Sequence, residues 1–440
     1  MASSYTLVVG LGTTGLSCVR FLTQYKTSLV VVDTRPNPPG LDQLREECPE
    51  VPFAPFSQEV FDQADRLVVS PGVSLSEPLI ESVIARGVPV IGDIELFAHH
   101  VKAPVIAITG SNGKSTVTTL VGEMARQAGL HVVVGGNLGV PALDLLDPKA
   151  DLYVLELSSF QLETTFTLDA HAAVVLNVTP DHLDRHGNID RYATIKSRVY
   201  QGQGWMVLNA DDPIVLSMKT PNRPIRQFSL SAPVGPNDYG ISIGANEEEW
   251  ISQGENLLLP TAEVRIPGRH NLANALAALA LAESVGLPVE SCLQTLREFP
   301  GLPHRCEFIA EIDGVAWYND SKGTNVGATE AACTGLEGPL VLIAGGQGKG
   351  QDFRPLQKVL QEKTRVVVLM GVDAPQIRAA LEDVVPVVEV SSLREAVRSA
   401  QQWAKPGDCV LLSPACASFD MFQNYVDRGE KFAQEVVGLL

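Results

Sequence analysis

The chain has 440 residues, of which 45% are hydrophobic and 19% are charged, and this composition excludes a disordered or fibrous protein. At roughly 150 residues per domain, the length predicts two or three globular domains. The 33 basic residues against 51 acidic ones leave a net charge of −18, so neither nucleic acid nor an anionic membrane is expected as a partner. An anionic substrate would need local positive charge from a few lysines, arginines, metal ions or helix N-termini.

The sequence pattern predicts a cytoplasmic protein. MASSYTLVVGLG passes directly into a strand-like run, without a basic region, a long apolar region or a cleavage site, so we expect no secretory signal. Apolar runs such as VVVLM near residue 370 are too short to span a bilayer. The seven cysteines are scattered, odd in number and contain no CxxC pair, which favours thiols in a reducing compartment.

Short strand-like runs alternate with helix-period segments, which is the pattern of parallel, doubly wound α/β sheets. Runs of Val, Ile and Leu without polar alternation are typical of strands covered by helices on both faces. The predicted strands are Tyr5 to Val9, Leu29 to Val32, Leu67 to Val69, Val105 to Thr109, Leu152 to Glu156, Ala173 to Asn177, Leu340 to Ala344, Arg365 to Met370 and Cys409 to Leu412.

The stretch from Trp205 to Pro267 differs, because turn residues separate its short apolar pieces. We expect a meander of edge strands that decorates the middle domain. A long Ala/Leu helix from Asn271 to Val285 and a second helix after Pro288 are predicted to follow.

Two joints divide the chain. The first α/β series ends around residues 92–103, and FPGLP at 299–303 ends the long helical stretch. We therefore predict three domains, over residues 1–95, 96–301 and 302–440.

The first glycine-rich loop follows the first predicted strand. Gly10-x-Gly12-x-x-Gly15 leads into a helix, and Asp33 ends the next strand, where a ribose-binding acid would lie. Such glycines let backbone amides approach a diphosphate at a helix N-terminus. NAD, FAD or another nucleotide diphosphate would fit this pattern, and a tight strand-to-helix turn without a ligand is the alternative.

The second loop, TGSNGKST, is the stronger indication of chemistry. It ends with the G-K-[ST] of a phosphate-binding loop, although Ile108 stands where the usual motif has its first glycine. Backbone amides from Gly110 to Lys114 can cradle phosphates, and the Lys114 ammonium can span the β and γ oxygens. A hydroxyl of Ser115 or Thr116 can bind Mg²⁺. A lysine with no anion here would oppose the helix dipole, which disfavours a purely structural role.

Further motifs accompany these two loops, and together they resemble the Mur ligases. The match is collinear from about Leu7 to Arg428, and only residues 205–265 lack a recognisable motif. In chain order the motifs are GLGTTGLS, TGSNGKST, GGNLG (135–139), ELSSFQLE (156–163), NVTPDHLDRH (177–186), HNLANALAALA (270–280), GLPHR (301–305), NDSKGTN (319–325) and SPACASFD (413–420).

The resemblance implies a Rossmann-like N-terminal domain for a UDP group, a central P-loop ATPase α/β domain and a Rossmann-like C-terminal domain that brings an amino acid. The first-domain motif is most similar to the branch that joins D-glutamate to UDP-N-acetylmuramoyl-L-alanine with ATP, in bacterial peptidoglycan synthesis. This reaction would activate a carboxylate as an acyl phosphate, which an amine then attacks, and it depends on positioning and charge neutralisation. The implied cofactors are ATP and two Mg²⁺ ions, and we expect a cytoplasmic monomer.

For the reaction centre the resemblance implies Lys114, Glu156, His182 and Lys196, with Ser115 as a further metal ligand. Glu156 ends a strand beside the phosphate loop, as a Mg²⁺ ligand would, or faces solvent. His182 lies in D-H-x-D-x-x-H, which alone could be a zinc site or a solvated loop, and the resemblance makes it a ligand of the second Mg²⁺. Lys196 alone would be a surface lysine, but the resemblance implies a carbamylated lysine, formed with CO₂, that binds metal.

Motifs and resemblance together assign residues to three substrates. The predicted ATP contacts are Gly110, Ser111, Asn112, Gly113, Lys114, Ser115, Thr116, Asn271, Asn274, Arg305 and Asp320. The predicted contacts of the UDP-linked substrate are Gly12, Thr13, Thr14, Asp33, Thr34, Arg35, Ser70, Gly72, Asn137, Ser158, Gln161 and His182. The predicted contacts of the amino acid are Lys322, Thr324, Lys349, Ser418 and Tyr425.

Simpler interpretations stay open for several of these residues. Asn271 is also a candidate helix cap, Arg305 and Asp320 are also a candidate charged pair on loops, and Lys349 is also a candidate surface lysine. Tyr425 departs from the family pattern, which has phenylalanine at this position.

Three functional alternatives also stay open. A related ligase with a different amino acid, or one similar to the folylpolyglutamate synthases, shares the central motifs. The first glycine loop would suit a nicotinamide-dependent oxidoreductase. The phosphate loop would also suit a binding module that hydrolyses ATP without transferring phosphate to a substrate.

Overall fold

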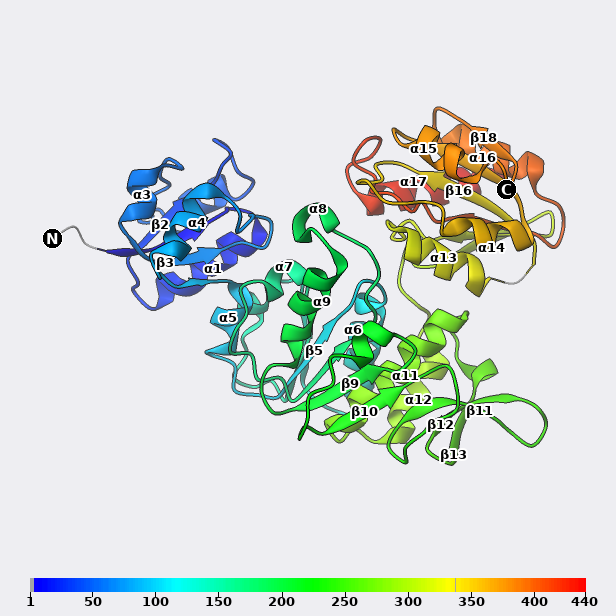
Figure 1. The fold of residues 1–440 in the computed structure, drawn as a ribbon, viewed down its shortest axis with the longest axis horizontal. Helices are drawn as coiled ribbons and strands as arrows, with labels where there is room; N and C mark the ends of the chain where they lie inside the picture. Colours follow the sequence, from blue (N-terminus) through cyan, green and yellow to red (C-terminus); the bar gives the residue numbers. More distant parts are fainter. Residues whose placement is uncertain (1–3, 337) are drawn as a thin grey trace.

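The computed structural model of the protein describes residues 4–336 and 338–440. Residues 1–3 lie outside this range. They are the start of the predicted first domain and of the N-terminus for which no secretory signal is expected. The chain forms three lobes in sequence order, each around one sheet (Figure 1). The limits predicted near residues 95 and 301 fall between the last strand of one sheet and the first strand of the next.

The N-terminal lobe is built on a four-stranded parallel sheet of order β2-β1-β3-β4. Its central strand carries Leu7, Val8 and Val9, which are all 0% exposed because helices cover both faces. The elements are β1 (Tyr5–Val9), α1 (Thr13–Gln24), β2 (Leu29–Val32), α2 (Leu41–Glu47), α3 (Gln58–Asp62), β3 (Ala64–Val69), α4 (Pro78–Ala85), β4 (Val90–Ile91) and α5 (Asp93–Ala98).

The central lobe has a nine-stranded sheet of order β13-β12-β11-β10-β9-β8-β5-β7-β6. Helix α11 is apolar almost all round, and it packs with α6 and α12 on one face of this sheet. The elements are β5 (Val105–Thr109), α6 (Lys114–Gln127), β6 (Val132–Gly136), η1 (Ala142–Leu145), β7 (Leu152–Glu156), α7 (Ser159–Leu162), β8 (Ala172–Val175), α8 (Leu183–His186), α9 (Ile189–Ser197), η2 (Arg198–Tyr200), β9 (Trp205–Asn209), α10 (Pro213–Leu216), β10 (Ile225–Phe228), β11 (Tyr239–Ile243), β12 (Glu249–Gln253), β13 (Asn256–Pro260), η3 (Thr261–Glu263), α11 (Arg269–Ser284) and α12 (Val289–Glu298).

Two sequence predictions for this lobe need correction. The expected meander is only β11 to β13, which pair antiparallel, whereas β9 and β10 continue the parallel sheet. The Ala/Leu helix begins two positions early, at Arg269, and Gly268 is its N-cap. Helix capping by Asn271 is therefore wrong, because this residue already lies inside the first turn.

The C-terminal lobe has a six-stranded sheet of order β14-β15-β19-β16-β17-β18, in which only β14 runs antiparallel to its neighbour. Strand β16 sends Leu340 and Leu342 into one core and Val341 and Ile343 into the other. The elements are β14 (Glu307–Ile312), β15 (Val315–Asn319), α13 (Val326–Gly335), β16 (Leu340–Gly345), α14 (Leu356–Lys363), β17 (Thr364–Met370), α15 (Ala374–Leu381), β18 (Val387–Glu389), α16 (Leu393–Trp403), β19 (Cys409–Leu412) and α17 (Tyr425–Val437).

The N-terminal and central lobes share one hydrophobic core. Val8 and Leu16 of the first lobe belong to the same buried cluster as Tyr153 and Leu155 of the second. Phe97 of α5 lies between them, with its ring centroid 5.2 Å from that of Tyr153. Within the described part of the chain, the two cores of the C-terminal sheet contain no residue of the other lobes. The C-terminal lobe therefore has cores of its own, and it meets the central lobe through the packing of α13 against α11 and through polar contacts.

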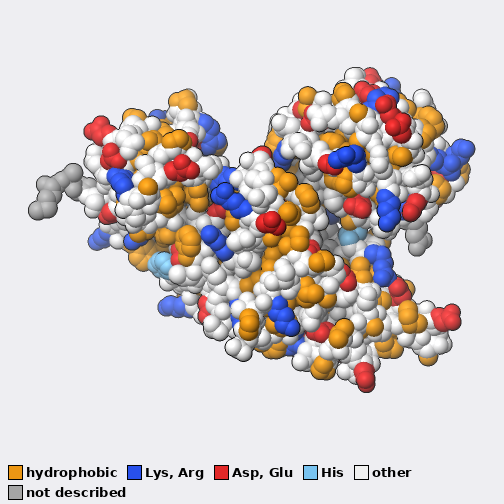
Figure 2. Space-filling view, viewed as in Figure 1, with side chains coloured by type: hydrophobic (Ala, Val, Ile, Leu, Met, Phe, Trp, Pro, Cys, Tyr) orange, Lys and Arg blue, Asp and Glu red, His pale blue; other side chains and the backbone are white. Residues whose placement is uncertain are grey.

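The surface mixes charges of both signs over all three lobes (Figure 2). Among residues 4–336 and 338–440, no helix has both the length and the apolar character that crossing a membrane requires.

Gly15 provides a stability test of the first glycine loop. A Cβ at Gly15 would lie 1.9 Å from the Gly10 carbonyl oxygen, whereas a Cβ at Gly12 would meet no atom within 4 Å. We expect Gly15→Ala to lower the free energy of unfolding by about 1–3 kcal/mol through overpacking. Gly12→Ala, the matched control, should change it by less than about 0.5 kcal/mol. Urea unfolding followed by circular dichroism measures both, and equal stabilities would contradict the close approach.

Candidate active site between the three domains

Asp33, which directly follows β2, is hydrogen-bonded to the first glycine loop. The Asp33 carboxylate accepts hydrogen bonds from the backbone N–H of Leu11 at 2.8 Å and of Arg35 at 2.9 Å. Arg35 Nε and Nη2 also donate to it, each at 2.9 Å. Burial opposes ionisation, but these donors outweigh it and lower the pKa of Asp33 to about 2. Ser70 closes the same loop, with its Oγ donating to the Gly10 carbonyl at 2.8 Å.

Other residues predicted for the UDP-linked substrate lie around this loop or in the central lobe. Thr13 and Thr14 open α1, and Thr13, Thr34 and Gly72 are exposed. Ser158 and Gln161 instead form a capping box at the start of α7. Gln161 Nε2 also donates to buried Asp93 at 2.9 Å. These two side chains therefore already have structural partners, which the motif alone did not indicate.

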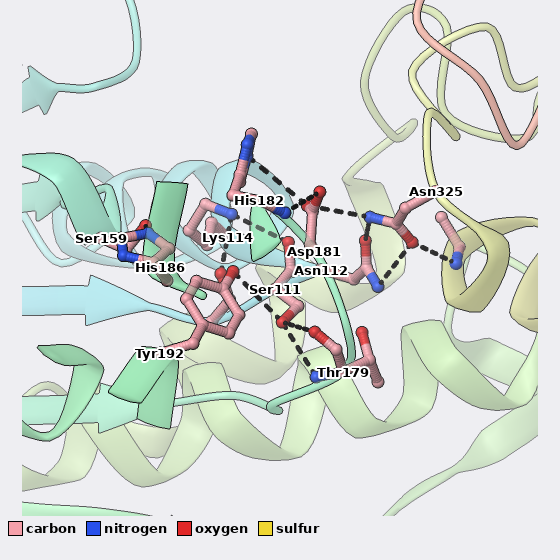
Figure 3. Close-up of polar contacts among 12 residues, drawn as sticks. Ser111, Asn112, Lys114, Ser159, Thr179, Asp181, His182, His186, Tyr192 and Asn325 are labelled. Carbon is pink, nitrogen blue, oxygen red and sulfur yellow. Dashed lines mark hydrogen bonds and ion pairs between the residues drawn. The ribbon is translucent and has the colours of Figure 1, made fainter. Parts of the chain in front are cut away.

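The second glycine loop lies between β5 and α6, as the motif predicts. Gly113 has a φ of +83°, and a Cβ there would lie 2.4 Å from Asn274 Oδ1, so glycine is required by both conformation and space. Lys114 Nζ donates to the carbonyl oxygens of Gly110 at 2.8 Å and Ser111 at 2.9 Å (Figure 3). Burial lowers the pKa of Lys114, although the charges of Glu156 and Asp181 oppose this effect.

Glu156 is a buried carboxylate next to this loop. It is 3% exposed, so the solvent-facing alternative is wrong. Its Oε1 accepts from Asn137 Nδ2 at 2.6 Å, and its Oε2 is buried with no hydrogen-bond partner. Burial opposes ionisation, but the charge of Lys114 and hydrogen bonds from Ser115 and Asn137 outweigh it and lower the pKa of Glu156. An unpaired anionic oxygen beside a serine hydroxyl suits a hard divalent cation such as Mg²⁺.

Lys196 is buried beneath the same loop rather than at the surface. It is 1% exposed, so the surface-lysine alternative is wrong, because the face of α9 that carries it packs against the domain core. Its Nζ donates to Gly110 O at 2.8 Å and lies 4.5 Å from the centroid of the Tyr192 ring. Burial and then the charge of Lys114 hold the pKa of Lys196 well below its ordinary value. Both effects shift the Lys196 amine towards its neutral form, which is the nucleophilic one.

His182 lies at the N-terminal boundary of α8 in a left-handed backbone conformation, with a φ of +52°. Burial lowers its pKa, which Asp181 opposes and the charges of Lys349 and Lys114 reinforce, so the neutral imidazole is favoured. Within the described chain, no group of three or more His, Cys, Asp or Glu side chains is arranged to hold a metal ion by itself. The zinc interpretation of D-H-x-D-x-x-H therefore lacks support, whereas Mg²⁺ commonly keeps waters and phosphate oxygens as ligands.

The C-terminal lobe reaches the phosphate loop through polar side chains. Arg305 Nη2 donates to Ser115 Oγ at 2.9 Å. The amides of Asn325 and Asn112 donate to each other at 3.1 and 3.4 Å. Asn325 also donates to Asp181 Oδ2 at 3.3 Å, so it bridges the loop and the segment of His182 (Figure 3). Sequence reasoning missed Asn325 and Asp181 as site residues, although both lie inside motifs that it quoted.

A cavity of about 270 Å³ lies between the central and C-terminal lobes. The predicted nucleotide residues Asn112, Gly113, Thr116, Asn271, Asn274, Arg305 and Asp320 line it. Asn274 Nδ2 donates to Asn271 Oδ1 at 3.2 Å, and Asn271 Nδ2 donates to Pro267 O at 2.7 Å. His270 also lines the cavity and was missed; burial lowers its pKa to about 4, so its imidazole is neutral.

The residues predicted for the amino acid lie in the C-terminal lobe. Lys322 Nζ lies 3.7 Å from the centroid of the Tyr425 ring, so these two residues meet. Ser418 is 2% exposed, and Lys349 is exposed in a left-handed conformation with a φ of +54°. Thr324 follows Lys322 in a tight turn, with its N–H donating to Lys322 O at 2.9 Å.

Comparison with known sequences shows three domain matches in order. Residues 4–92 match the Mur ligase MurD-like N-terminal domain, residues 108–282 match the Mur ligase middle domain, and residues 304–416 match the Mur ligase glutamate ligase domain. These matches cover most of the chain.

Similar proteins span the full length. A UDP-N-acetylmuramoylalanine--D-glutamate ligase of Nitrosococcus oceani is 56% identical over 99% of this chain and 97% of its own. The protein of that name from Methylococcus capsulatus is 52% identical over 99% of this chain and 95% of its own. Among solved structures, UDP-N-acetylmuramate-alanine ligase MurC of Thermotoga maritima is 18% identical, with a TM-score of 0.61 over 99% of this chain and 100% of its own. That structure shares the fold.

Asp320 provides a pH test of the cavity. Burial raises its pKa from 3.8 to about 7, against a hydrogen bond from Ser413 that lowers it. Between these values the folded protein keeps a proton that the unfolded chain has lost, so this group destabilises the fold increasingly as pH rises through that interval. Asp320→Asn removes the titration. We expect the Tm of wild type to fall relative to that of Asp320→Asn between pH 5 and pH 8, by calorimetry, and a constant difference would contradict the assignment.

Proposed function

The chain belongs to the Mur ligase family, and from that premise we propose that it is an ATP-dependent ligase that joins D-glutamate to UDP-N-acetylmuramoyl-L-alanine, releasing ADP and phosphate in bacterial peptidoglycan synthesis. The observation that carries the proposal is the meeting of Lys114, the orphaned oxygen of Glu156 and Arg305 of the C-terminal lobe at one phosphate loop, in a chain similar over its full length to ligases of that name.

Phosphoryl transfer would begin at the glycine loop. Amides from Gly110 to Lys114 would bind the phosphates at the N-terminus of α6. Lys114 Nζ, which donates to the loop carbonyls of Gly110 and Ser111, would turn towards the β and γ oxygens. Arg305 reaches the same place from the C-terminal lobe, so closure of that lobe would be part of forming the site.

The carboxylate of the UDP-linked substrate would attack the γ-phosphorus, forming an acyl phosphate as the bond to ADP breaks. The amine of D-glutamate would then attack the acyl carbon, releasing phosphate and losing a proton. Lys322 and Lys349 would bind the carboxylates of the amino acid, and Ser418 and Thr324 would supply further hydrogen bonds. The loop from Thr13 to Arg35, with Ser70 and Gly72, would hold the UDP group.

The residues present fit Mg²⁺, because Glu156 Oε2 is buried, unpaired and close to the Ser115 hydroxyl. When bound, Mg²⁺ supplies positive charge that offsets the crowded phosphate and acyl oxygens. Ser115, Glu156, His182 and a modified Lys196 would together hold the two expected Mg²⁺ ions, with His182 as a ligand of the second.

A carbamate at Lys196 is part of the proposal. The neutral amine would add to CO₂, forming an N–C bond and losing one proton, which turns a buried base into an anion. Burial and the low pKa of Lys196 support this step, because a protonated amine is not a nucleophile.

We propose that the protein works as a cytoplasmic monomer. Buried thiols at Cys18, Cys292 and Cys333 suit a reducing compartment, and one chain brings all the candidate groups together. The oxidoreductase alternative loses support because residues 108–282 and 304–416 match Mur ligase domains and the full-length relatives are ligases.

The acceptor assay tests the function. With UDP-N-acetylmuramoyl-L-alanine and ATP present, we expect ADP formation with D-glutamate and none above background with L-glutamate, L-alanine or diaminopimelate. A coupled assay for ADP together with mass spectrometry of the product measures this. If the rate of phosphate release is the same with and without the amino acid and the UDP-linked substrate, the protein would instead be a nucleotide-hydrolysing module.

In that assay Lys114→Ala is the decisive variant. Loss of its charge should lower kcat by roughly 10²-fold or more. Lys358→Ala, which removes an exposed lysine of α14, should leave kcat unchanged. An undiminished rate in Lys114→Ala would remove the basis of the proposed phosphate site.

Lys196 should respond to carbon dioxide. We expect wild type to lose activity in CO₂-depleted buffer and to regain it with bicarbonate, because the carbamate is reversible. With ¹³C-bicarbonate, a carbamate carbon signal should be seen by NMR in wild type and in Lys358→Ala, but not in Lys196→Ala. The modification would be contradicted if Lys196→Ala is active and its activity does not change when bicarbonate is added.

A further inference from the structure

Helix α8 carries His182 at its N-terminal boundary and is only one turn long. Figure 1 shows α8 at the end of the central lobe that faces the other two lobes. A single turn is not stable alone, so other contacts must hold the His182 imidazole. Its backbone is also in the left-handed region, which surrounding structure has to enforce.

Phe160 of α7 supplies part of that support. Its ring centroid lies 4.9 Å from the His182 ring in an edge arrangement and 5.5 Å from the His186 ring in a stacked one. The Arg185 guanidinium lies 5.2 Å from the same centroid. Three side chains of the 182–186 segment therefore surround one aromatic ring.

Arg185 fixes the segment on two sides. Its Nη2 donates to Glu163 Oε2 at 2.6 Å and its Nε donates to Glu163 Oε1 at 3.4 Å. The two side chains are 16% and 7% exposed, so the pair is largely desolvated and its geometry is restricted. Glu163 also faces His186 Nδ1 at 3.4 Å, and His186 Nε2 lies 3.0 Å from Ser159 Oγ. Figure 3 shows Ser159 and His186 together, at the opposite side of the view from Asn325.

The other partner of Arg185 belongs to the N-terminal lobe. Arg185 Nη2 donates to the Val73 carbonyl at 2.8 Å. The Val73 N–H donates to Ser70 O at 2.9 Å, and a Cβ at Gly10 would lie 2.8 Å from Val73 Cγ2. Val73 is thus packed against the first glycine loop, where the UDP group is proposed to bind.

We propose that Arg185 is a positioning residue that links the loop of Ser70 and Val73 to the segment of His182. It thereby holds the UDP-binding loop and the reaction centre at a fixed distance and orientation. The inference rests on the proposed function, which assigns a ligand to each of the two places. Arg185 contacts the UDP-binding loop at the Val73 carbonyl, and it acts on His182 through Glu163, Phe160 and α8.

The test compares three variants of the full chain. Arg185→Met keeps the apolar stem and removes both sets of hydrogen bonds, whereas Arg185→Lys keeps the charge opposite Glu163 but cannot reach both partners. Arg191→Met is the matched control, because Arg191 is exposed on α9. We expect kcat to fall roughly 10-fold in Arg185→Met, as for residues that orient a ligand group. The KM for ATP should stay unchanged, Arg185→Lys should recover part of the loss, and Arg191→Met should equal wild type.

Hydrogen exchange gives a readout that does not depend on turnover. The N–H groups of Arg185, His186 and Gly187 donate within α8, so they report its opening. We expect faster exchange over 182–187 and 70–73 in Arg185→Met, with the helices α6 and α11 unchanged. Equal exchange in these two segments, or an unchanged kcat, would overturn the proposal. Faster exchange throughout the central lobe with a raised KM for ATP would also overturn it, since that indicates general loss of structure.

Failure of this inference is separable from failure of the proposed function. If wild type turns over D-glutamate and Arg185→Met has the same kcat, only the role of Arg185 is overturned. A wild-type protein with no D-glutamate-dependent ADP release overturns the proposed function, whatever the exchange data show.

Discussion

Two lysines donate to one carbonyl oxygen at the floor of the phosphate loop. Lys114 Nζ and Lys196 Nζ each lie 2.8 Å from Gly110 O. Two like charges this close, and out of water, cost free energy unless one amine is neutral or an anion is near. The lowered pKa of Lys196 reduces this cost, because the amine gives up its proton more easily. The ionised Glu156 reduces it further, because its negative charge lies near Lys114. The rest of the site depends on this local balance of positive and negative charge at the phosphate loop, because the chain as a whole has a net charge of −18.

The three lobes are joined by two different kinds of contact, and this difference has a functional consequence. The N-terminal and central lobes both contribute residues to one buried apolar cluster, so moving one lobe against the other would disrupt a packed core. The C-terminal lobe meets the phosphate loop through Arg305 and Asn325, whose hydrogen bonds can exchange with water or with a nucleotide. The C-terminal lobe, which carries the groups proposed to bind the amino acid, is therefore joined to the phosphate loop by contacts that exchange more readily than those of a shared core.

Several residues have roles that their motif positions alone do not reveal. Asp33 and Ser70 close the first loop, and Ser158 and Gln161 cap α7. Such residues keep a loop in the shape that a ligand needs, so a structural partner and a place near the substrate are compatible. Asn137 illustrates this, since its amide donates to Glu156 and so restrains the candidate metal ligand.

The amino-acid sequence alone determined the α/β alternation, most of the strands, the two glycine loops and the family resemblance, because each is written in short-range patterns of apolar runs, turn residues and motif spacing. It could not place Lys196, whose burial depends on which face of α9 meets the core, nor the unpaired oxygen of Glu156, nor the pairing of Asn112 with Asn325 from a distant part of the chain. The sequence pattern also failed to predict that α11 starts at Arg269 rather than at Asn271. Only the tertiary structure decided these features, because desolvation and contacts between residues far apart in sequence arise when the lobes pack together.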